Sequence, residues 1–230
     1  FKNLYGINLV LEHQYEKAEP VLREAYETMI AHDSANLYAH ETLGLLAVVY
    51  ARTGRMQEAL VASRTSYENY LRHAGADSHY MALAEGLLGA HECSAGEYDS
   101  GIAHLESART KLRRQLGERH PQTQRMEFFL ARSLLKAGRR FEEVEHLLAG
   151  LDADTLETAS PERDWAPRLD LLRGELLIVT GRATEALPMI EPALQRLRDL
   201  GSAQAEVLAA EKRLHSLVAT SSKAMEDHLQ

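Results

Sequence analysis

Apolar residues recur at helical spacing along the chain, in pairs of segments separated by short turns. One face of a helix is marked by apolar residues at i, i+3, i+4 and i+7, and an example comprises Leu43, Leu46, Ala47 and Tyr50. Gly54 ends this segment as a residue that can take a positive φ, and residues 56–63 restart the same periodicity. The pattern therefore predicts two helices joined by a tight turn.

This pair of helices is one unit of an internal repeat, which sets the architecture of the whole chain. Three columns of equivalent positions recur with a period of about 42 residues. The first column comprises the residues Gly6, Ala47, Gly89, Ala131 and Gly174. The second column is the turn position and comprises His13, Gly54, Gly96, Gly138 and Gly181. The third column comprises Ala18, Ala59, Gly101, Val144 and Ala186.

The small residues of the first and third columns allow the two helices of a unit to cross closely. A single pair would leave one apolar face exposed, and the next unit covers that face in a solenoid. The sequence therefore predicts an all-α chain in the form of a solenoid of five helix pairs. The low aromatic content of 6 % and the scarcity of alternating Val/Ile-rich segments argue against an all-β fold.

The repeat resembles the tetratricopeptide repeat. The matching positions are Leu43, Leu46, Ala47, Tyr50, Gly54, Met56 and Ala59. The common form has about 34 residues, so the longer unit implies longer helices, as in kinesin light chains and many bacterial signalling proteins. The linker Leu116–Thr123 is similar to the Leu-Gly-x-x-His-Pro-x-Thr segment that opens such units. In it, we expect Gly117 to cap one helix and Pro121 to start the next.

The resemblance implies a right-handed superhelical solenoid of five units followed by a C-terminal capping helix. The expected units are 1–33, 34–75, 76–117, 118–160 and 161–201, with a cap at 202–219 and a frayed tail at 220–230. The first unit begins inside its first helix, so we expect further residues before Phe1. In the fourth unit we expect the second helix to stop at Gly150 and a polar stretch, Asp152 to Glu162, to lead into the fifth.

Composition places the chain among folded globular domains, because 45 % of its 230 residues are apolar and 26 % are charged. The longest stretch without a charge, Thr42 to Ala51, is about half the length of a membrane helix, and no apolar leader follows Phe1. We therefore expect no membrane insertion. The single Cys93 fits a reducing compartment and favours a cytoplasmic location.

The net charge of −8 is unevenly distributed. Ten basic residues and only two acidic ones lie between Arg109 and Arg140, which gives +8 there and −16 elsewhere. An acidic chain is a poor ligand for nucleic acid, so we expect no direct nucleic-acid binding. The basic segment suits an acidic peptide or partner protein, and a solvated helix surface is the equally weighted alternative.

Motifs for catalysis are missing from the sequence, which has no phosphate-binding loop, no GxGxxG and no HExxH. Glu92-Cys93-Ser94-Ala95-Gly96 lacks the leading glycine and the strand of a nucleophile elbow. None of the eleven histidines pairs with another at the i, i+3 or i, i+4 spacing of a zinc site. We therefore predict no enzyme activity, no metal and no cofactor, with the histidines at surface or half-buried positions and Cys93 as a packing residue.

In solenoids of this family, the first helix of each unit lines a concave groove that binds peptides or partner helices. Counting along the repeat places a basic and apolar set of residues in that groove. These candidate partner-binding residues are Val48, Arg52, Ala90, Arg125, Phe128, Arg132, Lys136 and Arg168. Guanidinium groups suit carboxylates, and Phe128 could contact an apolar side chain of the partner. The alternative, weighted equally, is that Phe128 and Leu171 pack on the neighbouring unit.

These features favour a protein–protein interaction module that binds an acidic peptide or partner segment. The resemblance implies the regulatory part of a larger bacterial signalling protein, such as a transcription regulator or a Ser/Thr kinase. The alternative is a free-standing adaptor or chaperone-like scaffold. The fold does not choose between them, and the sequence leaves the oligomeric state open.

Overall fold

The protein is helical throughout the residues that the structure describes. The computed structural model describes residues 2–75, 77–159, 164–201, 207–208 and 211–212. These residues form eleven helices, namely α1 (Lys2–Leu11), α2 (Tyr15–His32), α3 (Leu37–Arg52), α4 (Met56–His73), α5 (His79–Ala95), α6 (Tyr98–Leu116), α7 (Pro121–Lys136), α8 (Phe141–Gly150), α9 (Ala153–Ala159), α10 (Trp165–Val179) and α11 (Ala183–Asp199). No strand occurs in the described ranges, and the all-α class is confirmed.

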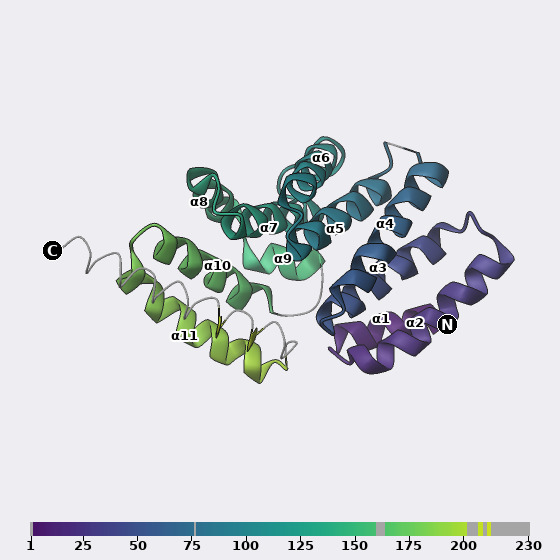
Figure 1. Ribbon diagram of the computed structural model, residues 1–230, viewed down its shortest axis with the longest axis horizontal. Helices are drawn as coiled ribbons and strands as arrows, with labels where there is room; N and C mark the ends of the chain where they lie inside the picture. The colour runs from purple at the N-terminus through teal and green to yellow at the C-terminus, as the bar shows by residue number, and fades with distance from the viewer. Residues whose placement is uncertain (1, 76, 160–163, 202–206, 209–210, 213–230) are drawn as a thin grey trace.

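The helices pack in sequence as five pairs, and the second helices α2, α4, α6 and α8 each also contact the first helix of the following pair. The first helices α1, α3, α5, α7 and α10 additionally contact one another in order, and we call them the first-helix layer. The ribbon forms an arch in which α3, α5 and α7 lie on the inner side and α4, α6 and α8 on the outer side (Figure 1). The predicted solenoid of helix pairs is therefore confirmed.

Each pair turns at a residue with left-handed backbone, which explains the second column of the repeat. The φ angle is 57° at His13 and between 66° and 93° at the four glycines of the column. Glycine adopts this conformation without the steric cost of a Cβ atom, whereas His13 bears that cost. The predicted turn column is confirmed in all five units.

The linker between α6 and α7 forms as the sequence predicts. Gly117 ends α6 with a φ of 92°, and Pro121 occupies the first turn of α7. The His120 ring accepts a hydrogen bond from the Gln122 amide at 3.2 Å, and the Thr123 hydroxyl donates one to the Gly117 carbonyl at 2.9 Å. These side-chain bonds satisfy backbone groups that helix ends leave without partners.

In the third unit, two helices cross with backbone directly against backbone. A Cβ atom added at Gly89 would lie 2.6 Å from the Gly101 carbonyl oxygen. One added at Gly101 would lie 2.5 Å from the Cys93 sulfur. In this unit, the first and third columns thus hold glycine because the two backbones approach each other directly.

The fourth unit departs from the regular pair. Helix α8 ends at Gly150, as predicted, but the expected polar stretch contains a further helix, α9, which packs on α7 and α10. Asp152 begins α9 by accepting a hydrogen bond from the Thr155 amide at 3.0 Å. The Arg173 guanidinium donates hydrogen bonds to the carbonyl groups of Leu148 and Leu151 at 3.2 and 3.4 Å. A side chain of α10 therefore satisfies the carbonyl end of α8, where no further helical turn does so.

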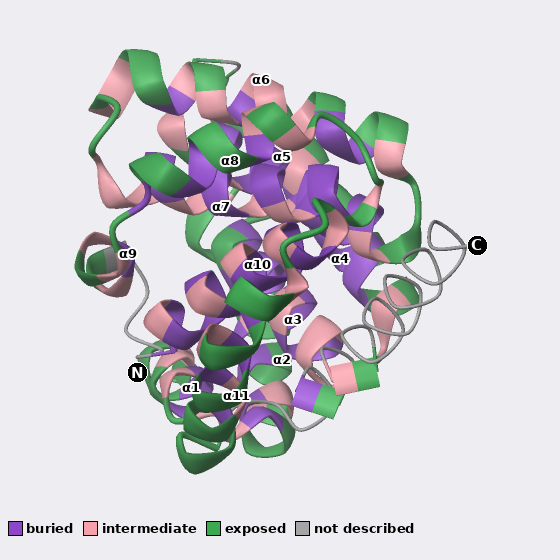
Figure 2. Cartoon of the chain, turned by 90° about the vertical axis from the view of Figure 1, so that its left-hand side faces the viewer, coloured by how far each residue is buried: buried purple, intermediate pink, exposed green. Residues whose placement is uncertain are grey.

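Burial is concentrated in the middle of the molecule. Figure 2 shows the buried positions gathered on α5 and α7, whereas α11 is largely exposed. One apolar cluster extends from α5 to α10, and a second one joins α1 to α4. Val207 is buried against α10 and α11. The remainder of the predicted cap at 202–219 and the whole tail at 220–230 lie outside the described residues, apart from 208 and 211–212.

Candidate functional site

The eight candidate residues all lie on the first-helix layer, but their side chains differ in exposure. Four are half-buried, namely Val48, Arg52, Arg125 and Arg132. Lys136, at the end of α7, is exposed. Ala90, Phe128 and Arg168 are buried. The half-buried and exposed residues therefore form the part of the set that a partner could reach.

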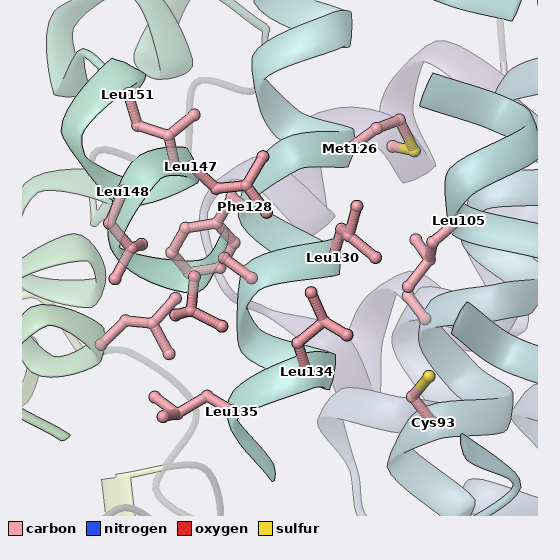
Figure 3. Packing of buried hydrophobic residues seen from close by; sticks show 14 of the residues in the cluster. Cys93, Leu105, Met126, Phe128, Leu130, Leu134, Leu135, Leu147, Leu148 and Leu151 are labelled. Carbon is pink, nitrogen blue, oxygen red and sulfur yellow. The ribbon is translucent and has the colours of Figure 1, made fainter. Parts of the chain in front are cut away.

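Phe128 packs into the core between the fourth and fifth units. Its side chain is 3 % exposed, and its ring meets Trp165 of α10 edge-on at a centroid distance of 5.2 Å. Figure 3 shows the ring directed toward Leu147 and Leu148 of α8, on the side of α7 opposite Leu130. The ring thus contacts the neighbouring unit, and almost none of it is left for a partner.

Arg168 belongs to a buried ion pair at the start of α10. Its guanidinium donates a hydrogen bond of 2.7 Å to Asp164, whose side chain is fully buried. Removing one partner of such a pair lowers the free energy of unfolding by much more than the intact pair adds to it, because the remaining charge is left buried without compensation. Arg168 therefore stabilises the start of α10, which is the first helix of the fifth unit.

Ala90 is buried on α5 near Cys93 and the crossing with α6. Burial raises the pKa of the Cys93 thiol, while a hydrogen bond with Ser133 and the positive charges of Arg132 and Lys136 act in the opposite direction. The thiol is therefore a packing group with cations of α7 beside it. This geometry brings the end of α7 next to α5.

His91 lies where the cations of two other helices meet, and the sequence prediction overlooked it. Its side chain is 6 % exposed, and Nδ1 is buried without a hydrogen-bond partner. Burial, together with the positive charges of Arg132 and Arg52, lowers the pKa of His91 to about 4. The imidazole is therefore neutral at pH 7, between cations of α3 and α7.

The repeat alignment contained the signal for this burial. His91 stands two residues after the first column, where the first unit carries the exposed Asn8 and the remaining three carry Val49, Ser133 and Leu176. All three of these side chains are buried. A histidine in such a column is expected inside the protein, which contradicts the predicted surface or half-buried position for this residue.

Nine of the ten basic residues between Arg109 and Arg140 fall into two groups in the structure, and the exposed Arg119 belongs to neither. Six of its residues contact carboxylates, as Arg109–Glu127, Lys111–Glu85, Arg113–Glu118, Arg114–Asp77, Arg139–Asp99 and Arg140 with both Glu106 and Glu143. Most of these acids lie outside the segment in the sequence, and folding brings them next to it. Much of the local positive charge counted along the sequence is therefore compensated in space.

The second group consists of Arg125, Arg132 and Lys136 on α7, joined by Arg52 from the end of α3. Each of these four cations takes part in a contact within the chain. The Arg132 guanidinium lies 5.3 Å from the centre of the Phe129 ring, a distance suited to a cation–π contact. We call these four residues, with His91, the inner cationic cluster.

The described residues bring together no group of three His, Cys, Asp or Glu side chains that could hold a metal ion. In the same part of the chain, every helix is too short or too polar to cross a membrane.

An arch of helix pairs with a continuous first-helix layer and left-handed turns every 41 to 43 residues defines a tetratricopeptide-like solenoid. The chain is similar to the crystal structure of a Podosopora anserina protein described as a kinesin light chain with nearly identical TPR-like repeats. The TM-score is 0.58 at 17 % identity, over 90 % of this chain and 95 % of that one. The predicted resemblance is confirmed for the fold. No protein-family model matches the chain, and no curated protein matches it either.

Proposed function

We propose that the protein is a protein–protein interaction module whose first-helix layer binds an acidic, partly apolar segment of a partner. The observation that carries the proposal is the convergence of Arg52 and Arg132, from two different helices, on the face of α5 that holds His91. Cations gathered from several repeat units suit an extended acidic ligand that crosses those units. Guanidinium groups bind carboxylates with two parallel hydrogen bonds.

Apolar contacts beside the cations support a ligand of mixed character. Val48 on α3 and Leu83 and Leu87 on α5 are half-buried on the first-helix layer. When a partner covers such side chains, the burial of their apolar surface contributes favourably to the free energy of binding. The charged groups then direct and orient the partner, because electrostatic complementarity acts mainly on specificity and on the rate of association.

The cations already have contacts within the chain, so binding proceeds by addition to an existing network or by exchange of partners. A pre-ordered guanidinium loses less side-chain entropy on binding than a free one. Phe128 and Arg168 do not contribute directly in this proposal, since both are committed to packing or to an internal ion pair.

The experiment measures the affinity of a fluorescent peptide of alternating glutamate and leucine residues by anisotropy. Reversing two charges, Arg132→Glu with Lys136→Glu, should weaken binding at least about tenfold, as expected for charges within the interface. The matched control reverses Arg113 and Arg114, which are exposed on α6 and form surface ion pairs. Equal affinities for both double variants would contradict the proposed surface.

We further propose that the module is the regulatory part of a larger cytoplasmic signalling protein, such as a bacterial transcription regulator or Ser/Thr kinase. The sequence resemblance and the single cysteine support this proposal. The intact mass of the native protein tests it. A mass near the 25.7 kDa of this chain would favour a free-standing adaptor or chaperone-like scaffold instead.

A further inference from the structure

A second buried histidine, His40, lies at the start of the second helix pair. It belongs to the first turn of α3, and its side chain is fully buried. Both ring nitrogens, Nδ1 and Nε2, lack a hydrogen-bond partner among the described residues. A buried polar group without a partner destabilises the folded state, whereas an apolar group of the same shape does not. The protein therefore holds a titratable ring at a position where an apolar ring would be more stable.

The second helix of the same pair, α4, supplies two rings that contact His40. The exposed His73 ring stacks on it at a centroid distance of 5.7 Å and an interplanar angle of 15°. The Tyr70 ring meets it nearly edge-on at 6.0 Å and stacks in turn on Tyr80 of α5 at 6.4 Å. Four rings from three helices thus form one contiguous group, in which His40 is the fully buried member.

Two hydrogen bonds attach α4 to the same turn of α3. The Tyr70 hydroxyl donates to the Leu37 carbonyl at 3.1 Å, and the Ser66 hydroxyl donates to the His40 carbonyl at 2.8 Å. We call these two bonds, together with the contacts of the His40 ring with Tyr70 and His73, the α3–α4 latch. The latch holds the start of α3 on α4 as long as the His40 ring stays in its buried place.

The surroundings of His40 oppose its protonation. Burial lowers the pKa of His40, and the charges of His73 and Arg72 on α4 act in the same direction. Asp33 and the backbone of Ser34, in the linker before α3, act more weakly in the opposite direction. A protonated ring in this position would therefore be a buried cation beside other cations.

Titratable groups on the other neighbouring elements have other contacts. The charge of Glu41, the next residue of α3, raises the pKa of Tyr70 in addition to the larger effect of burial. The His79 ring of α5 packs on Tyr80 at 3.9 Å. At the end of α2, the His32 ring hydrogen-bonds a carbonyl of its own helix at 3.2 Å. Asp33 is thus the carboxylate that acts on the His40 ring.

We propose that His40 makes the α3–α4 latch sensitive to acid: uptake of a proton moves the ring out of the core and releases the first turn of α3 from α4. In the open turn the imidazolium is solvated, so the cost of burying its charge disappears. The two hydrogen bonds from α4 are lost at the same time. The inference goes beyond the peptide binding proposed above and needs no partner.

Opening of the latch should increase as the pH falls below about 6.5, the ordinary pKa of an exposed imidazole. The pKa of His40 is lowered in the closed latch, so the open form binds more protons below this pH. Linkage then gives an increase in opening of up to about tenfold per pH unit, until the closed form also titrates. Well above pH 6.5, neither form binds the proton, and opening should not depend on pH.

Amide hydrogen exchange of the 230-residue chain measures this opening, after correction for the intrinsic pH dependence of exchange. Between about pH 6.5 and about pH 5.5, we expect the protection of amides 40–43 to fall by up to about tenfold. His40→Phe keeps a ring against Tyr70 and His73 but cannot take up a proton. It should remove this pH dependence and increase the protection of the same amides at both pH values.

The matched control is His91→Gln, which removes the buried histidine of the inner cationic cluster on α5. The acid-dependent loss of protection at amides 40–43 should persist in this variant. An equal loss in His40→Phe and in the wild-type protein would overturn the proposal, and so would a loss spread evenly over all helices. If His40→Phe does not fold, histidine ring NMR of the wild-type protein replaces it. A His40 ring that takes up its proton while amides 40–43 stay protected would contradict the latch.

Discussion

The third and fourth helix pairs are neighbours in the chain, yet they are held together by different means. In the third, α5 and α6 cross at Gly89 and Gly101 with no room for a Cβ atom, and both helices are long. In the fourth, the crossing residues are Ala131 and Val144, and the second helix is interrupted after Gly150. The same repeat position thus tolerates valine in one unit and excludes any side chain in the other.

The source of stabilisation differs accordingly. Within the third pair, Lys111 and His104 of α6 contact the buried carboxylates of Glu85 and Glu92 on α5. The fourth pair depends on the fifth, because Arg173 satisfies the end of α8 and Trp165 packs on Phe128. The third pair thus has ion pairs between its own two helices, whereas the end of the interrupted second helix in the fourth pair is satisfied by the following unit.

Gly101→Val should have the largest effect, because a Cβ atom there overlaps the Cys93 sulfur and the Gly89 carbonyl oxygen. We expect a loss of about 3 kcal/mol or more in the free energy of unfolding, the upper end for overpacking. Urea denaturation followed by circular dichroism measures it. Gly150→Ala is the control, since no atom lies within 4 Å of a Cβ atom at Gly150. A small loss at Gly101 would show that the crossing can widen.

Phe128→Ala should cost about 3 kcal/mol of unfolding free energy, because it empties a buried aromatic site against Trp165. Peptide affinity of the folded protein should stay unchanged. The half-buried Phe141, at the start of α8, provides a control through Phe141→Ala, with a smaller loss of stability. Reduced peptide affinity in Phe128→Ala without a loss of stability would instead place the ring in the partner interface.

Acid should destabilise the third unit through His91. Its pKa is about 4 when folded and about 6.5 when unfolded, so the unfolded chain binds more protons between these values. Stability is therefore complete above about pH 6.5 and falls as the pH decreases toward 4, by up to about 3 kcal/mol. The comparison of wild type with His91→Gln over this range isolates the effect. Parallel stability curves for the two proteins would contradict it.

Lys111→Met should cost about 1–3 kcal/mol, because it keeps the aliphatic stem but leaves the Glu85 carboxylate buried without its cation. Adding Glu85→Gln to this variant should restore part of the loss. Arg114→Met, which removes an exposed ion pair with Asp77, should cost less than about 0.5 kcal/mol. Thermal unfolding of the four proteins measures these differences, and equal losses for Lys111→Met and Arg114→Met would contradict the role of burial.

Arg173→Met should have the smallest effect, about 1 kcal/mol, since it removes two long hydrogen bonds to the end of α8. Hydrogen exchange should increase in α8 and α9 and remain unchanged in α5 and α6. Arg182→Met, which removes an exposed contact with Glu185 on α11, serves as the control. Faster exchange spread evenly over the whole protein would show that the fourth unit does not depend specifically on α10.

The fold could be predicted because the same local requirements on residue type recur in each of the five repeat units. A residue that tolerates positive φ, a small residue at the helix crossing and apolar residues at helical spacing each leave a mark at fixed positions. Helix α9 was not predicted, since its seven residues are mostly polar and its place depends on α7 and α10. Short elements of this kind are decided by tertiary contacts.

The candidate site was predicted only in outline. Position counting located the candidate residues on the first-helix layer, but it could not distinguish Phe128, which is covered by Trp165, from the half-buried Arg132. Charge counting identified the basic segment but not its partners, such as Asp77 and Glu85, which lie far away in sequence. The burial of a side chain and the identity of its ionic partners both depend on residues of other helices.

By itself, the sequence determined the helix pairs, their period and the turns between them, because each follows from the conformational preferences of nearby residues. Only the tertiary structure decided which cations are neutralised, and it alone brought Arg52 and Arg132 to His91. These outcomes depend on distances between residues some 40 positions apart, set by how closely successive helix pairs pack. Electrostatic effects depend on separation and burial in space, and the linear order of residues fixes neither.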